Sequence, residues 1–117
     1  IERMVTLMKN PATGIFNFHV PPHGSLIDDA PVLTQDLRVK YAGNALQPVG
    51  SRAVRTAIER MQPLLGLFGH IHESRGTTRI GRTLCINPGS MYEQGTLLGV
   101  LVKVEHGKIK NYVLTTG

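Results

Sequence analysis

Two short apolar runs, separated by about fifty residues, dominate the hydrophobic pattern of the chain. Residues 15–20 and 64–68 are almost continuously apolar, which is typical of strands buried on both faces. Between them, Ser51 is a suitable N-cap for a helix that Pro63 ends. The apolar positions of this helix share one face: Val54, Ala57, Ile58 and Met61. The order strand, helix, strand predicts a βαβ crossover with the two strands parallel and adjacent.

The connection between the first strand and this helix is long. Pro21-Pro22-His23-Gly24 stops the strand, and residues 25–50 then show no sustained hydrophobic period. We interpret them as an irregular connection with one helical turn near Thr34 to Lys40. Connections of this length are usually functional or mobile.

The first eight residues also carry apolar side chains at helical spacing. Ile1, Met4, Val5 and Met8 follow the i, i+3, i+4, i+7 pattern of an amphipathic helix, and residues 10–14 end it. Because this helix has no N-cap residue and Ile1 is not a start methionine, we expect further residues upstream.

The second half of the chain predicts two hairpins. Gly81-Arg82 separates residues 77–80 from 83–87, and His106-Gly107 separates residues 97–105 from 108–114. The expected fold class is therefore α/β, a βαβ unit followed by antiparallel hairpins.

Composition narrows the class of protein. At 117 residues, 41% of them hydrophobic, the chain is one domain or a piece of one, and it has no apolar run long enough for a membrane span. Cys85 has no cysteine partner and lies in the apolar run 83–86, so we expect it in the core. A protein without disulfides fits a reducing compartment, and we expect it to be cytoplasmic.

The net charge of +5 suits an anionic partner such as phosphate. The basic residues are spread along the chain rather than clustered, and the chain has three Tyr, three Phe and no Trp. A dedicated nucleic-acid surface, which needs a basic patch interleaved with aromatic residues, is therefore a weaker interpretation.

Three histidines follow the two predicted parallel strands. His19 ends the first apolar run, and His70 and His72 come just after the second. The carboxyl ends of parallel strands meet at one sheet edge, and alternating residues of an extended segment point to the same side. We therefore expect the three rings to converge. Neutral imidazole is the commonest protein ligand for zinc, iron, manganese and nickel, so this trio predicts a metal site.

His19 also has a purely structural interpretation, and two further histidines, His23 and His106, need an interpretation of their own. His19 alone could be a core histidine with a satisfied hydrogen bond, and His106 lies in a predicted hairpin turn where it needs no role. His23 follows two prolines in a loop and is a candidate substrate-binding residue. Gly69 would leave room for a close backbone approach beside His70.

The motifs around these histidines resemble those of the calcineurin-like metallophosphoesterases. Residues 69–72, Gly-His-Ile-His, look like the GHxH motif, and residues 18–22 look like the histidine motif that precedes it. Residues 87–90, Asn-Pro-Gly-Ser, are similar to the NPGS turn of compact bacterial and archaeal members. The ordered set, which spans roughly residues 15–102, is more specific than GHxH alone.

The resemblance implies that residues 1–117 are the C-terminal part of a single metallophosphoesterase domain, a two-sheet sandwich flanked by helices. It also implies a dinuclear centre that hydrolyses phosphate esters. His19 and His70 would bind one metal and His72 the other, while Asn87, Gly89 and Ser90 would support the site from beneath.

The family's Asp-x-His, Gly-Asp and Gly-Asn-His motifs do not occur in this sequence, and Gly43-Asn44 is followed by Ala45. The resemblance assigns to those motifs the bridging carboxylate and the histidine that protonates the leaving group. Without carboxylates, the repulsion between two divalent ions is not offset. We therefore assign no catalytic residue here, and we expect the chain alone to bind at most one ion and to be nearly inactive.

Three functions remain open. The leading hypothesis is hydrolysis of a phosphomonoester or phosphodiester, with divalent Mn, Zn, Fe, Ni or Mg, in a site that an N-terminal portion completes. The alternative is an inactive phosphoesterase-like scaffold whose exposed apolar surface another protein chain covers. Nucleic-acid binding is the third, and it predicts an affinity that falls steeply with salt.

Overall fold

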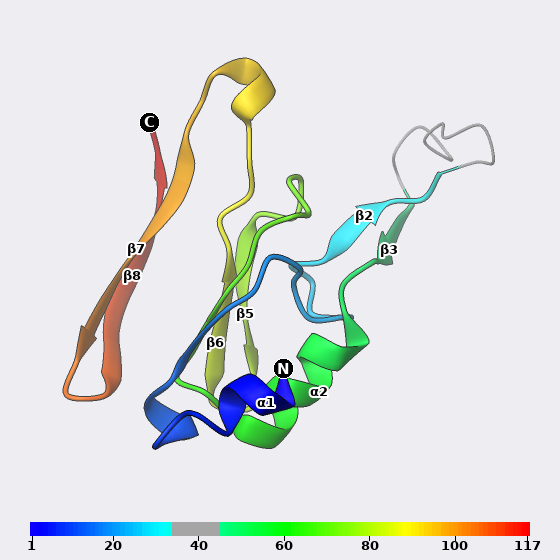
Figure 1. Cartoon of the computed structure of the whole chain (residues 1–117). Coiled ribbons are helices and arrows are strands. Elements are labelled where there is room, and N and C mark those ends of the chain that lie inside the picture. The colour runs from blue at the N-terminus through cyan, green and yellow to red at the C-terminus, as the bar shows by residue number, and fades with distance from the viewer. Residues whose placement is uncertain (34–44) are drawn as a thin grey trace.

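The computed structural model describes residues 1–33 and 45–117. Its centre is a four-stranded mixed sheet, with strand order β1–β4–β6–β5 (Figure 1). These strands are β1 (Ile15–Asn17), β4 (Leu65–Leu67), β6 (Thr83–Asn87) and β5 (Gly76–Ile80). β1, β4 and β6 are parallel, and β5 is antiparallel to β6.

Two separate two-stranded sheets accompany the central one. β2 (Asp29–Pro31) pairs with β3 (Leu46–Pro48), and β7 (Leu98–Glu105) pairs with β8 (Lys108–Thr116). The helices of the described residues are α1 (Glu2–Val5) and α2 (Arg52–Met61), with short 3-10 turns η1 (Pro11–Thr13) and η3 (Tyr92–Gln94). The chain is therefore a mixed α/β fold.

The predicted βαβ crossover is confirmed. β1 and β4 are parallel neighbours, with Phe16 opposite Gly66, and α2 lies between them in sequence. The hydroxyl of Ser51 accepts a hydrogen bond from the backbone N–H of Val54 at 3.2 Å, as its predicted N-cap role requires. Both predicted hairpins are also confirmed, because β5 pairs with β6 and β7 with β8.

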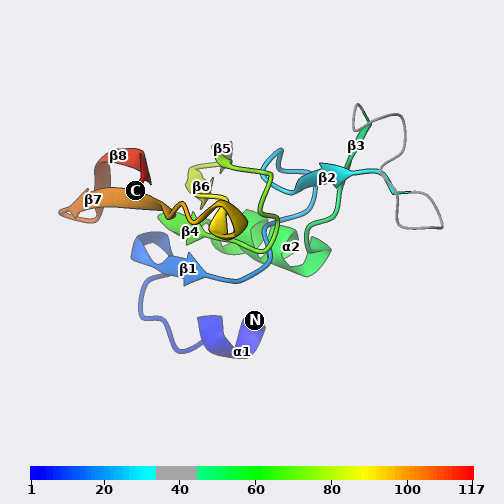
Figure 2. The ribbon, with the colours of Figure 1, turned by 90° about the horizontal axis from the view of Figure 1, so that it is seen from above.

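The central sheet is covered on both faces. α2 lies on one side and the β7–β8 hairpin on the other (Figure 2). On the α2 side, buried Val54 and Ile58 pack with Phe16, Phe68 and Cys85. The hairpin packs on the other face, where Leu65, Leu84 and Ile86 contact Val100, Val102, Ile109 and Leu114. This double coverage explains why all five residues of β6 are buried.

Some predicted elements differ from the structure. The first apolar run forms a strand of only three residues at the sheet edge, and Ile15 is 50% exposed because it has no strand on its outer side. The first helix ends at Val5, before Met8. Residues 25–50 contain the short β2–β3 hairpin, which the prediction missed. The helical turn predicted over 34–40 lies outside the described residues.

Cys85 is fully buried, as predicted. Across residues 1–33 and 45–117, no helix has the length and apolar character needed to cross a membrane.

Candidate functional site

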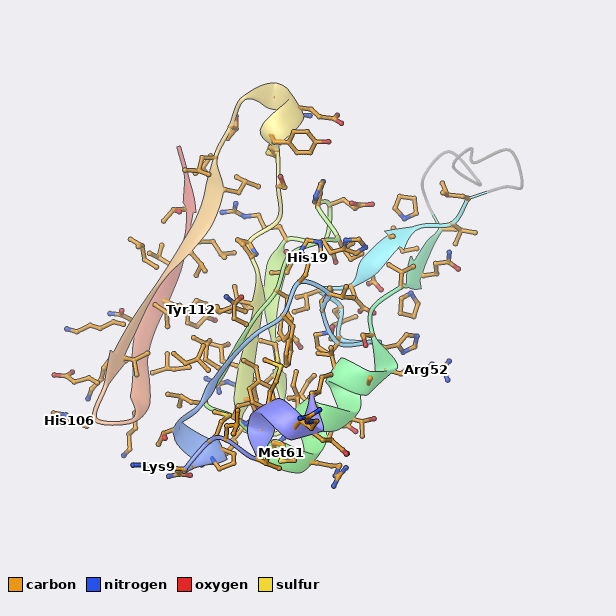
Figure 3. The ribbon with its side chains drawn as sticks, in the orientation of Figure 1. Lys9, His19, Arg52, Met61, His106 and Tyr112 are labelled. Carbon is orange, nitrogen blue, oxygen red and sulfur yellow. The ribbon has the colours of Figure 1, made fainter. Side chains whose placement is uncertain are left out.

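Two of the three predicted ligands lie next to each other. The Nε2 atom of His19 and the Nδ1 atom of His70 form a hydrogen bond of 3.1 Å, and the ring centroids are 4.8 Å apart. The backbone N–H of Gly69 donates to the His19 carbonyl at 2.9 Å, which extends the β1–β4 pairing past the strand ends. His19 lies at one end of the sheet, and His106 lies in the hairpin turn at the opposite end (Figure 3).

The backbone at His70 is in the left-handed region, with φ of 62°. The N–H of Ile71 donates to the carbonyl of Gly69 at 2.6 Å, so His70 is the central residue of a three-residue turn. A γ-turn with positive φ is rare and strained, and it persists only where the surrounding structure holds it.

His72 does not join the pair. Its ring packs against that of Tyr92, with centroids 5.5 Å apart and planes nearly perpendicular at 86°. The prediction that alternating residues would point to the same side assumed an extended segment, and the turn at His70 interrupts it. In the part of the chain that the structure describes, no three His, Cys, Asp or Glu side chains gather as a metal site would require.

The spacing of His19 and His70 suits two ligands of one ion. Two nitrogens bound to tetrahedral zinc at about 2.0–2.1 Å lie about 3.3 Å apart. Adjacent ligands of an octahedral ion at about 2.1 Å lie about 3.0 Å apart. The observed 3.1 Å falls between these values, and it is also the length of the hydrogen bond between the two rings, which an ion held by both nitrogens would replace. The pair could therefore hold a divalent ion that takes its other ligands from water, substrate or further residues.

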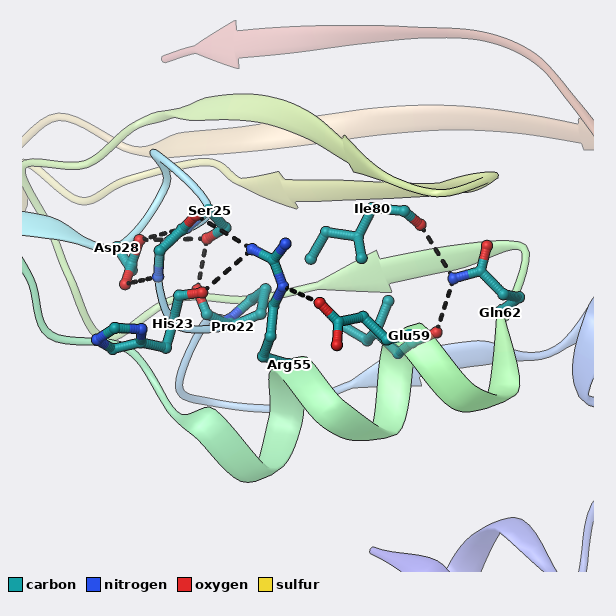
Figure 4. A network of polar contacts seen from close by, with 10 residues as sticks. Pro22, His23, Ser25, Asp28, Arg55, Glu59, Gln62 and Ile80 are labelled. Carbon is teal, nitrogen blue, oxygen red and sulfur yellow. Dashed lines mark hydrogen bonds and ion pairs between the residues drawn. The ribbon is translucent and has the colours of Figure 1, made fainter.

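The loop that follows β1 is held by a buried carboxylate (Figure 4). Asp28 accepts hydrogen bonds from the backbone N–H groups of Gly24 at 2.8 Å, Ser25 at 2.9 Å and Gly50 at 3.0 Å. The Ser25 hydroxyl also donates to it at 3.3 Å. Burial by itself would raise the pKa of Asp28, but these donors together lower it below its ordinary value. Because its oxygens already have these partners, Asp28 is poorly placed to serve as a metal ligand.

His23 belongs to this loop. Its backbone N–H donates to the Ser51 carbonyl at 3.1 Å, and its carbonyl accepts from the Arg55 guanidinium at 3.2 Å. Within the described ranges, the hydrogen bonds that fix His23 are made by its backbone, and the residue is half-buried. Substrate binding by His23 stays a prediction.

The Asn-Pro-Gly-Ser turn, residues 87–90, is hydrogen-bonded to the backbone of the histidine segment, residues 69–72. Asn87 is fully buried and donates to the carbonyls of Ile27 and Ile71. The Ser90 N–H donates to the His72 carbonyl at 3.1 Å. These contacts agree with the supporting role expected for the turn.

The backbone requires glycine at position 89 and does not require it at position 69. Gly89 has φ of 75°, and a Cβ atom there would lie 2.9 Å from both the His72 carbonyl oxygen and the Arg75 Cβ. At Gly69, a Cβ would come no closer than 3.9 Å to another residue. The close approach expected at Gly69 is therefore a hydrogen bond that any residue except proline could make.

The sequence analysis missed Asp28 and Tyr92. The spacing of Gly24, Ser25 and Asp28 after two prolines is a signal for a carboxylate that closes a turn. No local signal pairs Tyr92 with His72, since the contact joins two separate loops.

Comparison with known proteins gives one distant match and no family. No family model matches the chain. The uncharacterized protein MJ1162 of Methanocaldococcus jannaschii is 30% identical over 89 residues, which are 74% of this chain and 36% of that protein. The chain thus spans about a third of the length of the curated relative it matches. No solved structure matches.

Proposed function

We propose that this chain is part of a metal-dependent phosphoesterase and supplies histidine ligands to its metal centre. The observation that carries the proposal is the 3.1 Å separation of His19 Nε2 and His70 Nδ1 at adjoining ends of parallel strands. The GHxH-like, His-x-Pro-Pro-like and NPGS-like motifs support it, because they occur in the order that the resemblance requires. Under this proposal the fold is the C-terminal part of a two-sheet sandwich.

Each histidine has a defined task in this proposal. His19 and His70 hold one divalent ion, and the strained turn fixes the direction of the His70 ring. When bound, the ion supplies Lewis acidity to a phosphoryl oxygen and a template for in-line attack. His72 stands on the Tyr92 side of the turn, where it would bind a second ion or contact the substrate. His23 would contact the substrate from the loop after β1.

The described residues provide no carboxylate beside the pair, since no group of three suitable side chains occurs in those ranges. A second divalent ion close to the first needs negative charge nearby, because two such ions repel each other strongly. We therefore propose that residues outside the described ranges, upstream sequence or another chain complete the centre. The chain alone would bind one ion at most and would hydrolyse little.

Titration with Mn²⁺ and Zn²⁺ followed by calorimetry tests the ligand assignment. The wild type should bind about one ion, and His70→Ala should lose that binding. His106→Ala is the matched control, because His106 lies at the far end of the sheet, and it should bind as the wild type does. Equal affinity of His70→Ala and wild type would refute the assignment.

An assay on bis(p-nitrophenyl) phosphate with Mn²⁺ tests the activity. The chain should be nearly inactive alone and should gain activity within a longer polypeptide that includes upstream sequence. Hydrolysis that does not depend on His19 or His70 in that longer protein would contradict the proposal.

A second function, an inactive scaffold, is favoured by the separation of His72 from the histidine pair. A scaffold needs no metal, and its exposed apolar side chains, including Leu7 and Leu97, would be covered by a partner. Metal content after purification separates the two functions, since a scaffold would contain no metal and bind none on titration.

A further inference from the structure

A cavity of about 470 Å³ lies beside His72. Its lining includes His72, Glu73, Arg75, Ser90, Tyr92 and Glu93. The two segments that form it are joined, because the Ser90 N–H donates to the His72 carbonyl. Its size is within the range of ligand-binding pockets, about 300–1,000 Å³.

Tyr92 lies in a loop, residues 91–96, that is held by hydrogen bonds within its own backbone. The N–H groups of Gln94 and Thr96 both donate to the Met91 carbonyl, at 3.0 and 3.2 Å. The N–H of Gly95 donates to the Tyr92 carbonyl at 3.0 Å. Tyr92 is nevertheless 66% exposed, and its ring stands nearly perpendicular to that of His72. A fixed, exposed aromatic ring at a cavity is a platform on which another ring can stack.

The charges of the lining favour hydrogen-bond donors over anions. Glu73 and Glu93 bring two carboxylates, and one oxygen of Glu93 accepts a hydrogen bond from the Tyr92 hydroxyl at 3.3 Å, which leaves its other oxygen for a ligand. The Arg75 guanidinium is already bound to backbone carbonyls, of Pro88 at 3.3 Å and of Thr115 at 3.2 Å. The two carboxylates outnumber the single guanidinium, so a phosphate group would meet net repulsion here, whereas hydroxyl and amino groups would find acceptors.

We propose that this cavity binds the organic alcohol part of the substrate and that this part is a nucleoside. Its base stacks on Tyr92, and its hydroxyl or amino groups donate to Glu73 and Glu93. The inference rests on the proposed function for one point only, that the phosphoryl group lies at His19 and His70. It deepens that function by naming a nucleotide as the substrate class.

Titration with adenosine in the presence of EDTA, followed by ¹H–¹⁵N NMR of the full chain, tests the proposal. Saturable shifts are expected in residues 90–96 and around His72. Tyr92→Ala should weaken binding about tenfold or more, as the loss of base–aromatic stacking does. Tyr92→Phe, which keeps the ring, should bind within about twofold of wild type. Inorganic phosphate should not shift these signals.

Leu101→Ala is the matched surface control, because Leu101 is equally exposed on β7 and lies outside the cavity lining. It should bind adenosine as the wild type does. The proposal is overturned by the absence of saturable shifts in the wild type, by Tyr92→Ala binding as well as wild type, or by phosphate replacing adenosine in the cavity.

The chelator keeps this test separate from the metal test. Adenosine binding without any metal binding would leave the cavity assignment standing and remove the phosphoesterase proposal. Metal binding by His19 and His70 without adenosine binding would remove the cavity assignment and leave the phosphoesterase proposal standing.

Discussion

The side chain of Asn87 donates a hydrogen bond of 2.9 Å to the carbonyl of Ile71, the residue that separates the two histidines of the turn. Its second amide hydrogen goes to the carbonyl of Ile27 at 3.1 Å, and its own carbonyl accepts from the Gly89 N–H at 2.9 Å. Asn87 is fully buried. One side chain therefore joins the histidine turn, the loop after β1 and the turn after β6.

Replacement of Asn87 by Asp should test this link. The carboxylate would face two carbonyl oxygens, so we expect the free energy of unfolding to fall by about 3 kcal/mol or more. Urea unfolding measures the change. Asn111→Asp, on the exposed surface of β8, should change stability by no more than about 0.5 kcal/mol. Similar losses in the two variants would argue against the link.

His70 should be held in its turn at a cost to stability. Glycine adopts positive φ freely, whereas alanine does not, so His70→Gly should be more stable than His70→Ala by about 1 kcal/mol. Both variants lack the imidazole, and thermal unfolding compares them directly. At Glu73, whose φ is not positive, the same pair should show the opposite order. Alanine more stable than glycine at both positions would show that His70 is unstrained.

Asp28 should make the free energy of unfolding depend on pH in the acid range. Because hydrogen bonding lowers its pKa in the folded state, its contribution is complete above the ordinary value of 3.8. Below that value the unfolded chain takes up the proton first, so stability falls with pH. Asp28→Asn should lose part of this acid dependence and about 2 kcal/mol at pH 7, since its amide would face N–H donors.

Urea unfolding midpoints of wild type and Asp28→Asn between pH 7 and pH 3 measure both the loss of stability at pH 7 and the change in acid dependence. Asp29→Asn is the matched control, because Asp29 contacts Ser74 through its backbone N–H and not through its carboxylate. It should keep the acid dependence of the wild type. An Asp28→Asn profile parallel to that of the wild type would remove Asp28 as the source.

The thiol of Cys85 should be unreactive in the folded chain. Burial raises its pKa to about 12, so almost no thiolate exists at pH 8. Ellman's reagent should react only as fast as the protein unfolds, and the rate should rise with urea in parallel with unfolding. Rapid reaction without denaturant would contradict the burial of β6.

The sequence predicted the elements whose signals are local. Ser51 before an amphipathic run indicates a capped helix, and Gly81 and Gly107 mark tight turns. The parallel pairing of β6 with β4 has no such signal, since it joins distant segments. The position of His72 depended on the backbone conformation of a single residue, His70, which the histidine spacing does not encode. The crossover correctly predicted that His19 and His70 lie together. The prediction that the ring of His72 joins them is wrong.

The strand that carries His19 to its place is a short strand at the edge of the central sheet. β1 has three residues and a single neighbouring strand, and His19 lies two residues beyond its end. Opening of edge segments costs less than global unfolding. Detachment of β1 would separate the two imidazoles while β4, β6 and β5 stay intact, so any ion shared by His19 and His70 would also fasten the edge of the sheet.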